Sequence, residues 1–587
     1  MFLKCSTRRK DGKIHRSWSV VESRRVGRRV VQKHVLYLGE VSDRQRASWE
    51  RAVSVIDETS GECRQLSLIP EERASVISAS EVDALPVRLS ALRLEHPRQW
   101  GACWLADSLW RELHLDRFFA ERLGRSREDT AWEKVLRALT LYRLISPGSE
   151  WRMHRHWFAT TALPDLLAVD ERVAQPATLY RCHDLLLAHK EALFAHLRTR
   201  WSDLFAASYD ILLYDLTSTY FECDVPEADT DPRKFGYSRD RRSDCVQVVI
   251  ALVVTPEGLP LAYEMMPGNT TDKTTLTAMI ALLKKRHGKI GRIWVMDRGI
   301  PTEESLAQMR ACDPPMHYLV GTPKARLHRL EAALAERPWV EVRGQLRVKS
   351  VPEDGEIYVL TESPARVDKE RAMRRRTLKK YWQRLGELAR MKHAARDALL
   401  LKLGQARGEA GASARLVTVE VAETGALTYQ LDRGKLREAR RREGRYLLRT
   451  NLADHDPDAL WRYYMQLVFV EEAFRTLKGD LGLRPIFHQK PERIEAHLFV
   501  AFLAYCLSIT LRQHLRKLSS GLMPRAVLEK LATIQLLDVR VPTTDGRELL
   551  LVRRTEPDKE VALLLQQLGR TLPPQPPPKI SRPSLTV

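Results

Sequence analysis

The sequence predicts a mixed α/β protein built from several domains, and three observations support this class. Apolar strands alternate with amphipathic helices between Leu212 and Pro323, which favours a mixed sheet covered by helices. Strand-like alternation opens the chain, and helical periodicity fills the region from Trp100 to about Phe205. With 587 residues, the chain is long enough for several domains with sizeable cores.

The first two domains expected are a small basic β element and a mainly helical domain. Residues 1–45 alternate apolar and polar side chains, as in HRSWSVV and VVQKHVLYLG, and carry many more cations than anions. Residues 46–205 are expected to form a mainly helical domain, with helical periodicity from Trp100 to about Phe205, as in CWLADSLWRELHLDRFF and AWEKVLRALTLYRLI. Short helices rich in arginine and histidine suit a DNA-binding module, although a helical packing domain fits the same pattern equally well.

Residues 206–325 form the first part of the predicted core. ILLYDLTST is followed by CVQVVIALVVTPEGLPLAYEMM, two apolar runs that are broken at Pro256-Glu257-Gly258 and so predict a hairpin. A helix (KTTLTAMIALLKKR), a strand (RIWVMD), a second helix (TEESLAQMRA) and a last strand (HYLVGTP) complete the order β-β-β-α-β-α-β.

This order breaks in residues 326–455, which we interpret as an inserted basic α+β region. Strand-like pieces (WVEVRGQLRVKSV, EIYVLTE, ARLVTVEVAET) surround the long helical segment RVDKERAMRRRTLKKYWQRLGELARMKHAAR. The core is expected to resume in residues 456–545 with a helix that carries a glutamate. A C-terminal tail, residues 546–587, ends in TLPPQPPPKISRPSLTV, which should be extended or disordered.

The charge balance indicates a polyanionic partner. The formal net charge is +21, and lysine and arginine recur along most of the chain rather than in one tail. The alternative interpretation is a basic but solvated surface.

The cysteine and hydropathy patterns indicate a soluble cytosolic protein. The eight cysteines are scattered, with no CxxC pair and no cysteine/histidine cluster of zinc spacing, as expected of reduced thiols. The opening MFLKCSTRRKDGK turns basic after three residues, so we expect no signal peptide. The longest apolar run, from His497 to Leu511, is too short to span a bilayer and is expected to form a buried core helix.

Four polar side chains recur at helical spacing within YYMQLVFVEEAFRTLKGDLGLRP. Tyr464, Glu471, Arg475 and Lys478 are separated by seven, four and three residues, so on one continuous helix they would share a face. A carboxylate beside an aromatic ring and two cations suits a site where a metal-bound phosphate is held and attacked. Taken alone, Glu471 more often indicates a solvated helix face, because Glu472 stands beside it and an arginine follows four residues later.

Two apolar strands upstream each carry an aspartate, Asp215 in ILLYDLTSTYFE and Asp297 in RIWVMDRGIP. Phosphodiester cleavage and transfer require charge stabilisation on the attacking and leaving oxygens, which two Mg²⁺ ions about 4 Å apart can supply. We therefore expect Asp215, Asp297 and Glu471 to converge on one cation site. The alternative is that Asp215 caps a turn at Thr217 and Asp297 caps a helix that starts near Pro301.

These segments resemble the bacterial insertion-sequence DDE transposases of the group named after insertion sequence four. The signature of this group is tyrosine, two residues, arginine, three residues, glutamate, six residues, lysine, and Tyr464, Glu471 and Lys478 fall on this spacing. YDLTSTYFE and VMDRGIP resemble the two aspartate motifs of the group. The similarity covers about residues 205 to 515, and the basic β element is also reminiscent of one branch.

One position departs from the signature. Leu467 occupies the arginine position, where Arg462 or Arg475 could supply the missing cation. The departure concerns one phosphate contact and leaves the expected metal ligands unchanged.

The resemblance implies an RNase H-like catalytic core with an insertion between its last strand and the glutamate helix. It implies that Asp215, Asp297 and Glu471 bind two Mg²⁺ ions, which Mn²⁺ can replace, to cut DNA at the element's ends and join the freed 3′-hydroxyl to target DNA. The expected partners are double-stranded DNA, from the element ends and the target, and a second copy of the chain in a homodimeric synaptic complex. The expected location is the bacterial cytoplasm, at the nucleoid, without membrane contact.

Phosphate contacts would position the DNA without reading its sequence. Trp339 and Trp382 could stack on an unpaired base, although core packing is the commoner role of tryptophan. The residues expected to contact DNA are Tyr464, Arg475, Lys478, Arg374, Arg375, Arg376, Lys379 and Lys380.

Two alternative functions fit parts of the pattern. A nuclease of the same fold would cut DNA without joining it, and the large basic flanking domains argue against this because they suit the pairing of two DNA ends. A domesticated DNA-binding protein would need no catalysis, and the intact acidic trio argues against it because a pure binder would tolerate its loss.

Overall fold

The computed structural model describes residues 2–580, apart from 50–86, most of 272–291, 323–329, 342–346 and short gaps at 11–12, 27–28, 43–44, 47–48, 126–128, 241, 298, 331–332, 335, 392–395, 424–425, 453–455 and 545. The chain divides into two compact units, and each is described by itself. The first unit comprises residues 1–6, 17–288 and 468–587, and the second comprises residues 7–16 and 289–467.

The N-terminal strands β1 (Phe2–Lys10), β2 (Lys13–Val26) and β3 (Arg29–Gly39) form an antiparallel sheet, as the alternation predicts. Its apolar side is buried, and the backbone of Gly39 meets that of Gly521. A Cβ atom on Gly39 would lie 2.7 Å from the Gly521 Cα atom, so only glycine permits this approach.

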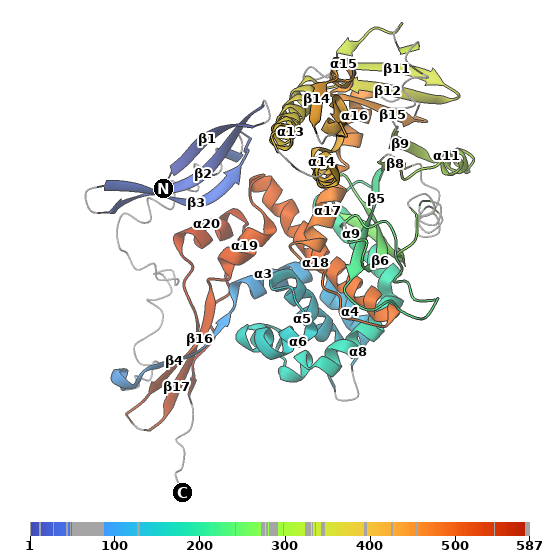
Figure 1. The fold of residues 1–587 in the computed structure, drawn as a ribbon. Helices are drawn as coiled ribbons and strands as arrows, with labels where there is room; N and C mark the ends of the chain where they lie inside the picture. The colour runs from blue at the N-terminus through green and yellow to red at the C-terminus, as the bar shows by residue number, and fades with distance from the viewer. Residues whose placement is uncertain are drawn as a thin grey trace. The chain divides into compact units, whose positions relative to one another are not determined.

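The helical region of the first unit is built around α18 (Pro491–Leu518). Figure 1 shows α3 (Gly101–Glu112), α5 (Trp132–Ile145) and α8 (Pro176–Leu186) around this helix, and each packs against it. The predicted core helix is therefore confirmed. Helix α18 is long and apolar enough to cross a bilayer, but 94% of its most apolar window is buried inside the protein, as in the core helix of a globular domain.

The remaining helices of this region are shorter. Their bounds are α4 (Leu115–Leu123), α6 (Glu150–Arg152), α7 (Leu163–Leu167), α9 (Lys190–Phe205) and α19 (Pro524–Leu531).

A three-stranded antiparallel sheet of the first unit comprises β5 (Ile211–Phe221), β6 (Val246–Val254) and β7 (Pro260–Pro267). Strand β6 is buried along its whole length, which explains its continuous apolar run. The predicted hairpin between β6 and β7 is confirmed, and Gly258 supplies the positive φ of +90° that the turn requires. Helix α17 (Val468–Lys478) packs against β5 and β6.

The C-terminal residues are more ordered than the sequence predicts. Strand β17 (Glu548–Arg554) pairs with β16 (Gln535–Pro542), which also pairs with β4 (Arg93–Gln99). The expected boundary before residue 546 therefore falls inside a hairpin. Helix α20 (Lys559–Gln567) follows, and β18 (Lys579–Ile580) joins the same sheet. The proline-rich stretch 571–578 has no helix or strand, and residues 581–587 lie outside the described residues.

The second unit contains a mixed sheet with the strand order β10-β11-β12-β15-β9-β8. Strands β8 (Ile293–Met296) and β9 (His317–Gly321) run parallel and are connected through α11 (Glu303–Arg310), as the sequence predicts. The other pairs, formed by β10 (Val340–Glu341), β11 (Arg347–Glu353), β12 (Glu356–Glu362) and β15 (Arg445–Thr450), are antiparallel. The helix expected at 273–286 lies largely outside the described residues.

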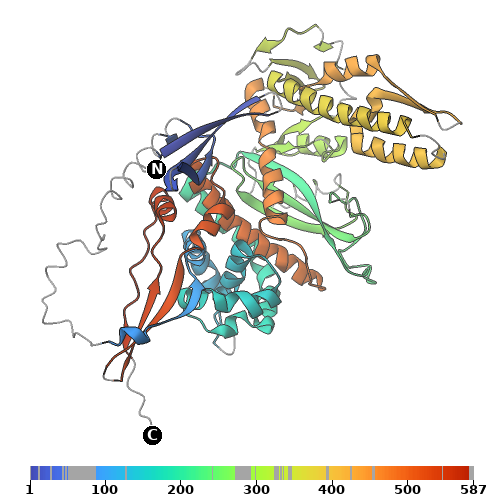
Figure 2. The same cartoon turned by 60° about the vertical axis from the view of Figure 1, so that its left-hand side comes forward.

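The region expected as an insertion divides into two parts. Strand β15 pairs directly with β9, so β10, β11, β12 and β15 extend the sheet of β8 and β9. Figure 2 shows the two helices α13 (Pro364–Ala389) and α14 (Arg396–Ala410) side by side, and they pack with β13 (Val417–Val421) and β14 (Leu427–Leu431) around a separate apolar core. Helices α15 (Arg433–Arg442) and α16 (Pro457–Met465) complete the unit. The domain limits given above stay a proposal.

Candidate active site

Asp215 lies in the middle of β5, between fully buried neighbours, and is itself half-buried. Its backbone pairs with Leu252 of β6. Strand β5 continues without interruption to Phe221, so the alternative that Asp215 caps a turn at Thr217 is wrong.

Asp297 follows directly on β8 and is exposed. The Tyr464 hydroxyl of α16 donates a hydrogen bond to Asp297 Oδ1 at 3.0 Å. The alternative role of Asp297 as a helix cap is wrong, because Thr302 caps α11 and forms a reciprocal capping box with Ser305.

Tyr464 belongs to an aromatic cluster of the second unit. Its ring centroid lies 6.2 Å from that of Tyr446 and 6.4 Å from that of Trp461. These contacts restrict the ring, so the hydroxyl is held toward the aspartate rather than left to rotate.

The predicted stripe of four side chains on one helix is wrong in one respect. Helix α16 ends at Met465 and α17 begins at Val468, so Tyr464 lies on a different helix from Glu471, Arg475 and Lys478. The two helices are separated by a turn at Gln466 and Leu467. No glycine or proline at this turn indicates the break in the sequence.

Glu471 is in the first turn of α17 and is exposed, whereas Val470, Ala473, Phe474 and Leu477 form the buried side of this helix. A carboxylate near a helix N-terminus is favoured by the helix dipole. The neighbouring Glu472 is directed elsewhere, with its Oε2 atom 3.8 Å from Arg516 Nη2 on α18. Glu471 therefore presents its carboxylate to solvent on a helix that packs against the strand of Asp215.

Lys478 makes a defined contact that the sequence does not predict. Its Nζ atom lies 3.0 and 3.1 Å from the two carboxylate oxygens of Asp240, and Arg484 Nη1 lies 3.2 Å from Asp240 Oδ2. Burial lowers the pKa of Lys478, and the Asp240 carboxylate acts in the opposite direction. The guanidinium of Arg484 also lies over the ring of Tyr220 on β5, 4.6 Å from its centroid. Two cations share one carboxylate, so this cluster keeps a net positive charge.

The five basic residues proposed on α13 do not form one face. Arg374 forms an ion pair with Glu443, and its side chain is 11% exposed. It lies on the same side of α13 as Tyr381 and Leu385, which enter the apolar core. Burial and the neighbouring Arg440 lower the pKa of Arg374. The other four residues, Arg375, Arg376, Lys379 and Lys380, are exposed, as is Arg475 on α17.

The tryptophans of the second unit differ in their surroundings. Trp339 is half-buried against the core around Tyr358, and cationic groups of Arg347, Lys349 and Arg445 lie 5.0 to 5.7 Å from its ring centroid. Trp382 is 39% exposed and contacts Tyr429 edge to face, with centroids 4.7 Å apart.

The comparisons with known proteins agree with the sequence motifs. A family model for the transposase DDE domain matches residues 222–507, and one for the N-terminal domain of the IS1634 family transposase matches residues 3–67. Asp297 and Glu471 lie within the first match, and Asp215 lies just before its start. The search of curated proteins found no match.

One similar solved structure is a cryo-EM structure of piggyBac transposase in a synaptic complex with hairpin DNA. Its sequence is 11% identical to this one, and the match covers 76% of this chain and 82% of that chain. The TM-score of 0.34 is too low to support a structural argument.

The two matches and the motifs define a protein that cuts DNA and transfers the cut strand. The chain belongs to the insertion-sequence DDE transposases. Enzymes of this family bind DNA and use divalent metal ions, and the resemblance drawn from the sequence is thereby confirmed.

Proposed function

We propose that Asp215, Asp297 and Glu471 form the catalytic centre of this transposase, in an RNase H-like core. The observation that carries the proposal is the packing of α17, with an exposed Glu471, against the strand that bears Asp215. Asp297 is the third acid, at the exposed end of β8. Convergence of the three carboxylates is part of the proposal.

The three side chains fit Mg²⁺, with Mn²⁺ as a substitute, because all are carboxylates and these hard ions prefer oxygen ligands. When bound, two such ions supply the charge that stabilises the attacking and leaving oxygens of a phosphodiester. The chain's own part is to hold the acids: β5 fixes Asp215, the Tyr464 hydroxyl orients Asp297, and the first turn of α17 presents Glu471.

Basic side chains around this centre would hold DNA. Arg475 lies one helical turn after Glu471 on the exposed side of α17, and the cluster of Lys478 and Arg484 lies at the end of the same helix. The exposed cations of α13 are a further phosphate-binding surface. The chain would pair the two element ends as a homodimer in a synaptic complex, join each 3′-hydroxyl to target DNA, and work at the bacterial nucleoid.

The proposal is tested with three conservative variants, Asp215→Asn, Asp297→Asn and Glu471→Gln. Each is expected to lose cleavage of duplex DNA that carries the element's end, by at least about a thousandfold, because one metal ligand is lost. DNA binding should stay near the wild-type level. The matched control is Glu472→Gln, which changes the adjacent carboxylate that is directed toward Arg516.

A second substrate separates cutting from joining. On DNA ends that are already cut, wild-type protein should join the 3′-hydroxyl to a target plasmid, and the three variants should not. Cleavage without joining by the wild-type protein would make it a nuclease. Full cleavage by Glu471→Gln would remove Glu471 from the catalytic centre.

A further inference from the structure

A second group of potential metal ligands lies in the first unit, away from the residues discussed above. Glu150, at the start of α6, is 4% exposed and is surrounded by three histidines. The distances from Glu150 Oε1 are 3.4 Å to His488 Nε2, 3.7 Å to His183 Nε2 and 3.9 Å to His497 Nδ1. We call these four residues the Glu150 cluster.

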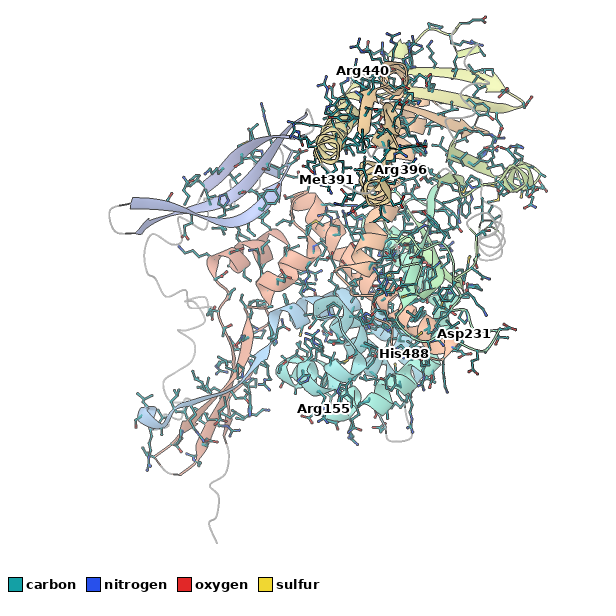
Figure 3. The ribbon with its side chains drawn as sticks, viewed as in Figure 1. Arg155, Asp231, Met391, Arg396, Arg440 and His488 are labelled. Carbon is teal, nitrogen blue, oxygen red and sulfur yellow. The ribbon has the colours of Figure 1, made fainter. Side chains whose placement is uncertain are left out.

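The members of the Glu150 cluster come from four separate segments. His183 belongs to α8 and His497 to α18. Figure 3 labels His488, which lies on the segment between α17 and α18. All three histidines are at most 6% exposed, so water reaches their ring nitrogens poorly.

Several of these buried nitrogens have no hydrogen-bond partner among the described residues. This holds for both ring nitrogens of His183 and for Nε2 of His488. A buried polar atom without a partner destabilises the fold, so each such atom calls for an explanation, and a bound ion is a common one.

His497 is held in the orientation that a metal ligand needs. Its Nε2 atom lies 3.2 Å from the carbonyl oxygen of Leu483, so Nε2–H donates to this carbonyl and Nδ1 carries the lone pair. This lone pair accepts from Arg143 Nη2 at 3.4 Å and lies on the side of Glu150, so an ion would compete with Arg143 for it. Metal-bound histidines usually donate their second ring N–H to a carbonyl or carboxylate in this manner.

The spacing of the ligand atoms suits a tetrahedral ion. With metal–ligand bonds of about 2.0 to 2.1 Å, the corners of a tetrahedron lie about 3.3 Å apart. The three distances from Glu150 Oε1 exceed this value by a few tenths of an ångström. His183 lies outside the group whose ligand atoms are all close to one another, so its ring would turn toward the ion to become the fourth ligand. The ligand atoms of Glu150, His488 and His497 all lie within 4.8 Å of one another.

Arg143 also faces the Glu150 cluster. Its Nη2 atom lies 3.4 Å from His497 Nδ1, so this guanidinium offsets the charge of the buried Glu150 carboxylate while no ion is bound.

We propose that Glu150, His183, His488 and His497 form a structural Zn²⁺ site. The donor set of three imidazole nitrogens and one carboxylate oxygen is one that Zn²⁺ favours and Mg²⁺ avoids. With His183 as the fourth ligand, the buried site would have no open position for a substrate, which distinguishes a structural from a catalytic zinc site. The site is independent of the catalytic centre proposed above.

The ion would attach the segment after α17 to the helices around α18. The protein already anchors this segment at three points: Arg143 donates to the Gly482 carbonyl, His497 donates to the Leu483 carbonyl, and Arg233 binds Gln489. A bond from zinc to His488 would add a fourth anchor, next to Gln489, and would thereby fix the end of the helix that carries Glu471.

The test uses the full-length protein, stripped with EDTA and then equilibrated with ZnCl₂ and passed through a desalting column. Elemental mass spectrometry should find about one zinc per chain. Zinc content should fall at least about tenfold in the double variant His183→Asn/His488→Asn. It should stay unchanged in His156→Asn, which alters an exposed histidine, and in Asp215→Asn, which alters the catalytic centre.

A cobalt titration tests the site without any variant. If the double variant does not fold by circular dichroism, the stripped wild-type protein is titrated with CoCl₂. Intense visible absorption bands, typical of tetrahedral Co²⁺ with imidazole ligands, support the site, and a weak octahedral spectrum overturns it. Failure of the wild-type protein to retain zinc also overturns the proposal and leaves Glu150 as the acceptor of a metal-free hydrogen-bond network.

Discussion

The Tyr464 hydroxyl donates a hydrogen bond to Asp297 Oδ1 at 3.0 Å, although 167 positions separate the two residues in the chain. Both residues belong to the second unit, in which α16 packs against β8 and β9. The resemblance to the transposase signature implies a phosphate contact for Tyr464. The structure instead gives its hydroxyl a protein partner, which favours a role in positioning the aspartate.

The first prediction concerns Tyr464→Phe. Removing the hydroxyl leaves the ring in its aromatic cluster but removes one hydrogen bond that orients Asp297, so cleavage should fall by roughly tenfold, the order expected for loss of a group that orients a metal ligand. Affinity for end DNA should change little. The measurement pairs a cleavage time course with a binding titration, and Tyr446→Phe, in the same cluster, is the control. A loss confined to binding would restore the phosphate-contact role.

Much of the fold follows from local patterns in the sequence. The β6–β7 hairpin can be predicted because Pro256-Glu257-Gly258 separates two apolar runs. Helix α18 can be predicted because its apolar stretch is too long for a strand. The break between α16 and α17 cannot be predicted from the sequence. Apolar residues continue through Leu467 at helical spacing, and no glycine or proline interrupts them.

Other features depend on contacts between distant segments. The turn between β16 and β17 carries the signal Thr-Thr-Asp-Gly, so this hairpin could have been predicted, but its pairing with β4 could not. The Glu150 cluster has no metal-binding spacing in the sequence, because helix packing brings its members together. For the same reason, Asp240 gives no sign that it contacts Lys478.

The second prediction concerns divalent metal. Stripping with EDTA should abolish cleavage, and Mg²⁺ or Mn²⁺ should restore it, because the three proposed ligands are all carboxylates. Zn²⁺ alone, added at one equivalent per chain, should not restore it. The measurement is cleavage of labelled end DNA after each addition. Full activity in EDTA would contradict a metal mechanism.

The third prediction concerns the contact of Lys478 and Arg484 with Asp240. In Asp240→Asn, the two cations no longer share a carboxylate, so they are available to phosphates. Affinity for duplex DNA should rise, and the slope of log affinity against log salt should steepen by about 0.9 for the one charge gained. Asp224→Asn, which removes an exposed carboxylate of the same unit, is the charge-matched control. An equal change in both variants would show a general charge effect.

The last prediction concerns the basic surface of α13. Replacing the exposed residues Arg375, Arg376, Lys379 and Lys380 with glutamine should flatten the salt slope by up to about 3.6, at about 0.9 for each cation that contacts a phosphate. Preference among end sequences should stay the same, since phosphate contacts do not read bases.

Arg374→Gln is the internal control for this surface. It removes a cation of the same helix, but one that is already paired with Glu443, so it should lower the melting temperature without changing the slope. The measurement is a binding titration on the element's own terminal DNA at several salt concentrations. An unchanged slope in the fourfold variant would assign these cations to the solvated surface and leave the DNA contacts to α17 and the N-terminal domains.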